Sequence, residues 1–358
     1  MHNCHEISEG LVYLGGNDRR ISLFESAYPV PRGVSYNSYL LKDEKTVLID
    51  TVDIAVGDLF FENLAYALGG APLDYVIVQH MEPDHSATFA RLIELYPDVT
   101  VVTSQKAAVM LKNYFGYAGQ AHLVKEGDTL SIGKRTLTFV GAPMVHWPEV
   151  LITYVPEDGI LFSADAFGTF GAVSGSIIAD KDVFEREYLD DARRYYFNIV
   201  GKYGVQVQAV LKKAAGLKIS TVCPLHGPVW KDGFAWYLDK YLTWSAYQPE
   251  EKCVAIFYAS VYGHTQNAAE IVASAIAAQG VRVKVFDVSV TDKSELVSAA
   301  FGYSHLVFAS TTYNNGIFVN MEDFLSDLKA HNFQNRAYAI VENGTWAPQS
   351  GALMDGIL

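Results

Sequence analysis

The C-terminal part of the sequence alternates strictly between strand-like and helix-like segments, and this rhythm constrains the fold more than any other feature. Apolar runs predict strands at 253–258, 281–287, 305–310 and 337–341. Helical periodicity lies between them, at 267–279, 292–300 and 321–329. Such alternation is typical of a doubly wound parallel sheet. A five-stranded sheet of this kind needs one more strand and helix, so we expect this domain to be truncated at its C-terminus.

The first 250 residues have a different pattern, with many short apolar runs separated by Gly, Pro and Asp. Strands are predicted at 39–41, 46–49, 75–78, 99–102, 136–140, 151–155 and 160–162, and helices at 87–95 and 106–115. Many strands with few helices indicate a layered α/β domain. The polar, Pro-bearing stretch 245–252 is the best linker candidate. We therefore expect two domains, 1–248 and 252–358, as the length of 358 residues also suggests.

Composition excludes several classes of protein. Half of the residues are hydrophobic and 19% are charged, which is typical of globular chains. No apolar run reaches the roughly 18 residues of a membrane span, and the N-terminus lacks the pattern of a signal peptide. A net charge of −13 disfavours nucleic acid and anionic membranes as partners. Three cysteines cannot form a disulfide framework, which favours the reducing cytoplasm.

A cluster of histidines and carboxylates follows the predicted strand 75–78. If Gln79 to His85 is extended, alternate side chains share one side, so His80, Glu82 and Asp84 can converge on one centre. Pro83 is expected to prevent a helix before Ser86. Three more potential ligands, His146, Asp165 and His226, each follow an apolar run and could meet the cluster at one edge of a sheet. The set predicts a metal site, whereas His2, His5, His122, His305 and His331 are read as structural.

Three polar loops that carry aromatic residues follow strands of the C-terminal sheet, at 259–266, 310–316 and 342–348. The first leads into a helix N-terminus, which suits a phosphate group, although Ser and Thr there are also ordinary caps. Ligands of open α/β sheets bind at such strand ends, and the absence of G-x-G-x-x-G disfavours a dinucleotide. The expected ligand-binding residues are Ser260, Val261, Tyr262, Gly263, His264, Thr265, Thr311, Thr312, Tyr313, Asn314, Gly316, Asn343, Gly344, Thr345, Trp346 and Ala347.

The metal motif H-x-E-x-D-H with its three distant ligands resembles the metallo-β-lactamase-like domain of flavodiiron proteins, and the three loops resemble the FMN site of a flavodoxin. The resemblance implies an αββα sandwich followed by a flavodoxin-like sheet. It implies one iron bound by His80, Glu82 and His146, a second bound by Asp84 and His226, and Asp165 as a bridge. It leaves the role of His85 open. Zinc hydrolases of this fold usually have His at the position of Glu82, and a carboxylate there favours iron.

The resemblance also implies reduction of dioxygen to water, of nitric oxide to nitrous oxide, or both, with electrons passing through FMN, whose ring Tyr313 and Trp346 could flank. It implies rubredoxin or a related reductase as electron donor, and a head-to-tail homodimer or dimer of dimers. Glu25 stands where members often have the His of Phe-His-Gly, so the preference between the two gases stays open. Tyr195, Tyr196 and Trp147 are candidate pocket residues, with core packing as the alternative for a tyrosine. A zinc hydrolase fused to a flavodoxin module and a plain electron carrier are the other candidate functions.

Overall fold

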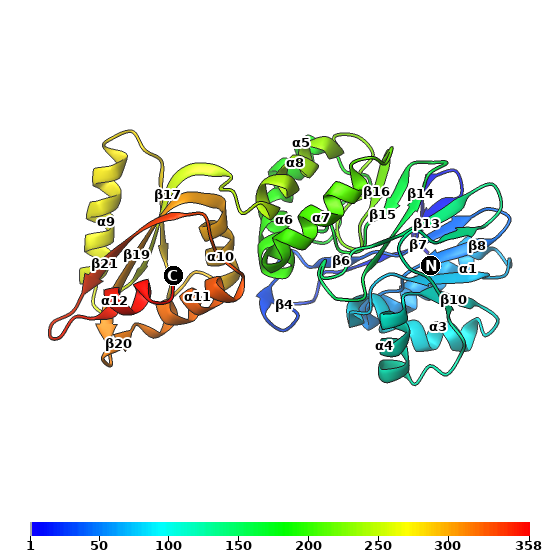
Figure 1. The fold of residues 1–358 in the computed structure, drawn as a ribbon, viewed down its shortest axis with the longest axis horizontal. Coiled ribbons are helices and arrows are strands. Elements are labelled where there is room, and N and C mark those ends of the chain that lie inside the picture. Colours follow the sequence, from blue (N-terminus) through cyan, green and yellow to red (C-terminus); the bar gives the residue numbers. More distant parts are fainter. Residues whose placement is uncertain (1) are drawn as a thin grey trace. The chain divides into compact units, whose positions relative to one another are not determined.

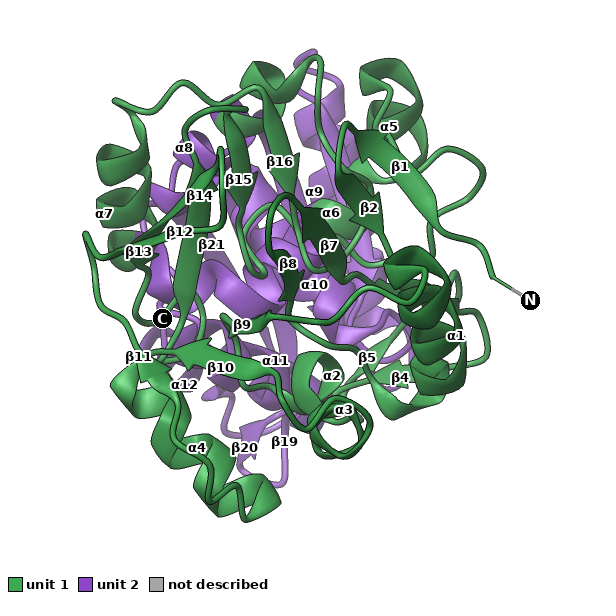
Figure 2. Ribbon diagram, turned by 90° about the vertical axis from the view of Figure 1, so that its right-hand side faces the viewer, with its two compact units in different colours: residues 1–192, 205–238 green, residues 193–204, 239–358 purple. Residues whose placement is uncertain are grey.

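The computed structural model describes residues 2–358 and divides the chain into two compact units. The first unit contains Met1–Ala192 and Val205–Leu238, and the second contains Arg193–Gly204 and Asp239–Leu358 (Figure 2). The second unit therefore includes a short helical segment that comes from well before the polar stretch at 245–252. The expected domain boundaries at 248 and 252 stay a prediction.

The first unit is built on two stacked sheets. The seven-stranded sheet has the order β1-β2-β7-β8-β9-β10-β11, and the five-stranded sheet runs from β12 to β16. Their bounds are β1 His5–Ser8, β2 Leu11–Tyr13, β7 Tyr39–Lys42, β8 Thr46–Ile49, β9 Tyr75–Val78, β10 Thr100–Thr103, β11 His122–Leu123, β12 Thr129–Ser131, β13 Thr136–Gly141, β14 Leu151–Val155, β15 Ile160–Phe162 and β16 Thr221–Cys223. One hydrophobic core contains side chains of both sheets, among them Leu41 and Ile77 of the first and Phe139 and Phe162 of the second.

Helices cover the outer faces of these sheets, which gives the expected αββα sandwich (Figure 1). The helices of this unit are α1 Gly57–Leu68, α2 Pro83–Ser86, α3 Phe89–Leu95, α4 Gln105–Phe115, α5 Lys181–Glu187 and α7 Gly204–Ala214, with the short turn η1 Ile54–Val56. Helices α6 Leu189–Tyr195 and α8 Phe234–Ser245 begin in the first unit and end in the second, which also contains η2 Tyr196–Val200 and η3 Gly201–Tyr203. Two small ribbons pair β3 Gly16–Asp18 with β6 Val34–Tyr36, and β4 Leu23–Phe24 with β5 Tyr28–Pro29.

One local prediction in this unit is wrong. Pro83 does not keep the segment extended, because α2 begins at Pro83 itself. Proline is well tolerated at the first helical position, where its missing N–H has no partner to lose. Asp84 and His85 therefore lie on a helical turn and do not continue the alternation of His80 and Glu82.

The second unit contains the predicted doubly wound parallel sheet. Its parallel strands lie in the order β18-β17-β19-β21, and β20 pairs antiparallel with the end of β19. The elements are β17 Glu251–Ala259, α9 His264–Ala277, β18 Val283–Asp287, α10 Lys293–Gly302, β19 Tyr303–Tyr313, β20 Gly316–Ile317, α11 Val319–Ala330, β21 Ala337–Asn343 and α12 Ser350–Asp355. Ala269 and Ala273 of α9 pack against Ile256 and Val307 of the sheet. None of the helices described in residues 2–358 has the length and apolar character needed to cross a membrane.

Candidate metal centre

The structure brings all seven predicted metal ligands together at the strand ends of the first unit. They form two groups in which the ligand atoms lie within 4.8 Å of one another. The first group contains His80, Glu82, His146 and Asp165, and the second contains Asp84, His85 and His226. All seven residues are buried. His85, whose role the sequence left open, lies in the second group.

Asp165, which follows β15, lies between the two groups. Its Oδ2 atom is 3.3 Å from Nε2 of His80 and 3.2 Å from Nε2 of His146. Its Oδ1 atom is 3.1 Å from Nε2 of His85 and 3.7 Å from Nε2 of His226. Each carboxylate oxygen thus faces a different group, which is the geometry that a bridging ligand requires.

The donor atoms fit metal ions better than they fit one another. Both carboxylate oxygens of Asp84 and Oδ1 of Asp165 are buried and accept no hydrogen bond from the described residues. Nε2 of His85 lies only 3.1 Å from Nε2 of His226. Buried carboxylates without donors are strongly unfavourable unless a cation compensates them. Separations near 3 Å are also the spacing of ligand atoms around an ion with bonds of about 2.0–2.2 Å.

The charges of the first group keep its acids ionised. Burial alone would raise the pKa of Glu82, but hydrogen bonds from His146 and His80 hold that pKa well below its usual range. Burial alone would lower the pKa of His146, but hydrogen bonds to Asp165 and Glu82 raise it to about 9.

Sequence reasoning missed the residues that orient these ligands. Glu149 Oε1 lies 2.9 Å from Nδ1 of His80 and accepts the Met81 N–H at 2.9 Å. Nδ1 of His226 lies 2.8 Å from the carbonyl oxygen of Ser35. Asp50 accepts the backbone N–H of Gln79 at 2.7 Å. The proximity of Glu149 to His146 in sequence was a weak hint, whereas Ser35 and Asp50 carried no signal.

Glu25 lies beside the first group, and a catalytic role for it stays a prediction. It is in the turn between β4 and β5, and although much of the residue is exposed, its carboxyl group hydrogen-bonds to Glu82. Burial of that carboxyl group and the neighbouring Glu82 raise the pKa of Glu25 to about 8. The Trp147 ring stands at 90° to the His80 ring, with centroids 5.4 Å apart.

The two tyrosines named as pocket candidates belong to the second unit and are fully buried. The Tyr196 ring packs against Tyr241 at 4.9 Å and Trp244 at 5.3 Å, which agrees with the alternative role in core packing. A role for Tyr195 in the gas-binding pocket stays a prediction.

The three loops of the predicted flavin site lie at the carboxyl ends of β17, β19 and β21, which are neighbours in the sheet. Ser260 Oγ accepts the Gly263 N–H at 3.0 Å, and α9 begins at the next residue. Asn343 Nδ2 donates to Thr265 Oγ1 at 3.2 Å, so the third loop is tied to the first. Strand β17 has β18 on one side and β19 on the other, so the order of the strands switches sides at β17, and such a switch point is where ligands of this fold bind.

Two details of these loops differ from the sequence prediction. Strand β19 continues to Tyr313 because its end pairs with β20, so the second loop is reduced to a turn at Asn314 and Asn315. Helix α9 begins at His264, three residues before its predicted start, so Thr265 lies in its first turn. The aromatic residues Tyr262, Tyr313 and Trp346 are exposed, which suits contact with a planar ligand.

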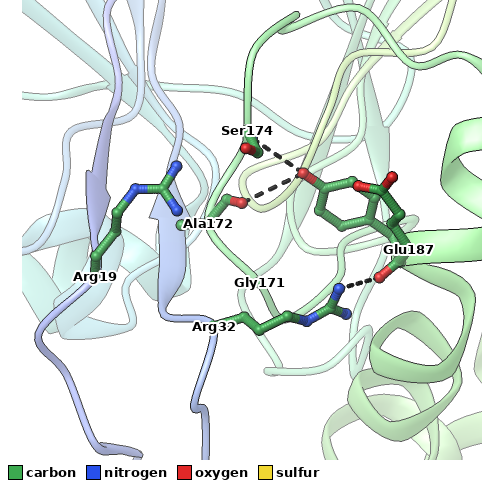
Figure 3. Close-up of a pocket in the computed structure, with 7 residues that line it drawn as sticks. Arg19, Arg32, Gly171, Ala172, Ser174 and Glu187 are labelled. Carbon is green, nitrogen blue, oxygen red and sulfur yellow. Dashed lines mark hydrogen bonds between the residues drawn. The ribbon is translucent and has the colours of Figure 1, made fainter.

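A separate cavity of about 230 Å³ in the first unit contains none of the predicted ligands in its lining (Figure 3). Its walls include Arg19, Arg32 and Tyr188. The Tyr188 hydroxyl accepts the Ser174 N–H at 3.0 Å, and Arg32 pairs with Asp191 at 2.5 Å. Arg19 donates to the carbonyl oxygen of Val173 at 2.8 Å. These contacts join the segment before β6 to the 171–174 loop and to α5 and α6.

The fold and the site together define a two-metal protein of the metallo-β-lactamase fold joined to a flavodoxin-like module. The family model described as "ODP family beta lactamase" matches residues 34–227, and the flavodoxin model matches residues 256–347. The chain belongs to the flavodiiron protein family.

Individual relatives agree with this assignment. A nitric oxide reductase of Moorella thermoacetica is 33% identical over 326 residues, which cover 90% of this chain and 81% of the relative. The rubredoxin oxygen:oxidoreductase structure of Desulfovibrio gigas has a TM-score of 0.93 at 28% identity, covering 99% of this chain and 89% of that one. The flavodiiron protein structure of Giardia intestinalis has a TM-score of 0.92 at 27% identity, covering 98% and 86% of the two chains.

Proposed function

We propose that this protein is an oxidoreductase that reduces dioxygen to water, nitric oxide to nitrous oxide, or both, at a pair of iron ions that receive electrons through FMN. The observation that carries the proposal is the pair of buried histidine–carboxylate groups that share Asp165. The names of the two relatives, nitric oxide reductase and rubredoxin oxygen:oxidoreductase, support the two gas substrates.

The ligands divide between the irons as the two groups divide in the structure. His80, Glu82 and His146 would hold one ion, Asp84 and His226 would hold the other, and Asp165, which lies between the two groups, would contact both. The position of His85 Nε2, 3.3 Å from Asp84 Oδ2, supports His85 as a further ligand of the second ion. Iron is favoured over zinc because Glu82 adds a hard oxygen donor. When bound, two ferrous ions and a two-electron-reduced FMN supply the four electrons that reduction of dioxygen to water requires.

Other residues of the chain shape the two sites. With a pKa raised to about 8, the Glu25 carboxyl group holds a proton at neutral pH and presents it beside Glu82. The Trp147 ring restricts the position of the His80 imidazole. In the second unit, the Ser260–Thr265 loop at the N-terminus of α9 would hold the FMN phosphate, and Tyr313 and Trp346 would supply aromatic contacts to the flavin ring.

Partners and location complete the proposal. Rubredoxin or a related reductase donates the electrons, in line with the name of the Desulfovibrio gigas protein. The working unit is a head-to-tail homodimer or a dimer of dimers. A cytoplasmic location is proposed because Cys4, Cys223 and Cys253 are all free thiols.

Metal and flavin analysis of the purified chain tests this function. We expect about two irons, or manganese in an iron-poor preparation, and one FMN per chain. Asp165→Asn should lose more iron than His85→Ala, because a bridge contacts both ions. Anaerobic stopped-flow mixing of the reduced protein with each gas should show reoxidation. Stoichiometric zinc without a redox-active metal would contradict the proposal and indicate a hydrolase, and an iron-loaded chain that reacts with neither gas would indicate an electron carrier.

A further inference from the structure

The two groups of the metal centre offer matched inner ligands. Each supplies two imidazoles and one carboxylate of its own, Glu82 in the first group and Asp84 in the second. Each also receives one oxygen of Asp165 at 3.1 to 3.3 Å from its nearest imidazole nitrogen. Ligand number and type therefore do not distinguish the two positions.

The hydrogen-bond partners of the imidazole Nδ1 atoms do distinguish the two metal positions. Nδ1 of His80, in the first group, is 2.9 Å from the carboxylate of Glu149, whose side chain is fully buried. Nδ1 of His226, in the second group, is 2.8 Å from a backbone carbonyl oxygen. Nδ1 of His85, also in the second group, is buried without a hydrogen-bond partner among the described residues. The fourth imidazole, His146, lies in the first group, and no hydrogen bond is seen from its Nδ1 among the described residues.

A carboxylate behind an imidazole has two effects on a metal ligand. It fixes the proton on Nδ1, so that Nε2 is free to bind, and it makes the ring a stronger donor than a carbonyl partner does. When Nδ1 has no hydrogen-bond partner, nothing fixes the proton on that atom or strengthens the ring as a metal ligand. Each group has one imidazole without an outer partner, so the difference between the groups is the Glu149 carboxylate behind His80 against the Ser35 carbonyl behind His226.

We propose that the two metal positions are unequal, that the first ion binds to the group of His80, Glu82 and His146, and that Glu149 is the positioning residue that causes this order. The inference rests on the proposed two-metal function and adds an order of assembly to it. The second ion then completes the centre at Asp84, His85 and His226, where Asp165 already presents its Oδ1 atom.

The experiment is a titration of the metal-free, full-length chain with Co(II) under argon, followed by EPR and visible absorption. We expect the first equivalent to give the EPR signal of an isolated Co(II) ion, with an affinity at least about tenfold above that of the second. His146→Ala should remove the tight step, and His226→Ala should keep it. Glu149→Gln should lower the metal affinity of the His80 group by about 10- to 100-fold and leave the affinity of the His226 group within about twofold of its value in the parent chain.

Asp50→Asn is the matched control. Asp50 and Glu149 are both buried carboxylates that accept backbone N–H groups next to His80, but only Glu149 contacts the ring. Asp50→Asn should therefore change the ratio of the two affinities much less than Glu149→Gln does. Equal weakening by both variants would overturn the role of Glu149, and two equal affinities in the parent chain, or loss of the tight step in His226→Ala, would overturn the order. A parent chain that never binds a second ion would overturn the proposed two-metal function itself.

Discussion

Glu25 and Ser26 both have positive φ angles, +50° and +56°, in the turn between β4 and β5. Such a backbone is uncommon for residues other than glycine. With this backbone conformation, the Glu25 carboxyl group lies next to the carboxylate of Glu82, a predicted metal ligand. Two acids therefore meet next to the metal positions, at a place where the resemblance implies a histidine in many members of the family.

We therefore expect Glu25→His to change the ratio of nitric oxide to dioxygen turnover. A carboxylic acid and an imidazole place their protons differently, and a positioned proton donor contributes about 10²- to 10⁴-fold to a rate, so a shift of at least about tenfold is expected. Stopped-flow rates with each gas measure the ratio. Glu25→Gln is the control, since it keeps the shape and cannot transfer the proton. Unchanged ratios in both variants would show that Glu25 has no part in the choice of gas.

At the scale of single residues, the sequence predicted the metal-ligand residues but not the residues that hydrogen-bond to them and orient them. His, Glu and Asp at strand ends form a recognisable set, so all seven residues of the two groups could be predicted. Glu149 and Ser35 act through single hydrogen bonds to His80 and His226, and the Ser35 contact spans 191 residues of sequence. Nothing in a single sequence marks such a partner, because many residue types, or the backbone alone, can supply it.

At the scale of elements, periodicity predicted the parallel sheet of the second unit well and the helices of the first unit poorly. Helices α5 to α8 and α1 were not predicted, nor were the ribbons β3–β6 and β4–β5. The ribbons are only two or three residues per strand, too short for a periodic signal. Pro83 was misread because the same residue that breaks a helix interior also begins many helices.

The stretch 245–252, which the sequence predicted to be a polar linker, contains a partly buried carboxylate, that of Glu250. Glu250 accepts hydrogen bonds from Arg193 Nε at 2.7 Å, Lys240 Nζ at 2.6 Å and Trp244 Nε1 at 3.1 Å. Burial would raise the pKa of Glu250, but Arg193 and Lys240 lower it to about 2. The carboxylate thus connects α6, α8 and the start of β17 within the second unit.

Glu250→Gln should destabilise the second unit by about 1.5 to 3 kcal/mol at pH 7, the usual contribution of a hydrogen-bonded charged group. Because its folded pKa is below the unfolded value of 4.5, this stabilisation is present above pH 4.5 and disappears as the pH falls toward 2. Hydrogen exchange at the amides of β17 measures the effect. The difference between parent and variant should shrink between pH 4.5 and 2, and a difference independent of pH would contradict the assignment.

Helix α9 offers a paired test of the flavin loop. Gly263 precedes the helix with φ +90° and Gly280 follows it with φ +76°, and a Cβ at either position would meet no atom within 4 Å. Substitution by alanine should strain the backbone similarly, by about 1 to 2 kcal/mol. Only Gly263→Ala should lower FMN affinity, measured by flavin fluorescence on titration of the flavin-free chain. Equal FMN affinity in the two variants would contradict the placement of the phosphate in this loop.

At the scale of the whole molecule, the question is how electrons pass from flavin to metal. The metal ligands and the flavin loops each lie at the strand ends of their own unit. The flavin that serves a given metal centre can belong either to the same chain or to a partner chain. A head-to-tail pair of chains with an isologous interface could bring each flavin to the metals of its partner.

We therefore expect activity to be shared across a dimer. One variant lacks the metal site (His80→Ala with Asp165→Ala), and the other lacks the flavin loop (Ser260→Ala with Thr265→Ala). Each should be inactive alone, because electrons cannot complete the path in either homodimer. After subunit exchange, a mixed dimer holds one intact flavin facing one intact metal site, so up to half of its sites should regain turnover of dioxygen or nitric oxide. Native mass spectrometry confirms the exchange independently of activity. Exchanged dimers that stay inactive would show that electrons move within a single chain, since no mixed dimer contains a chain with both sites intact.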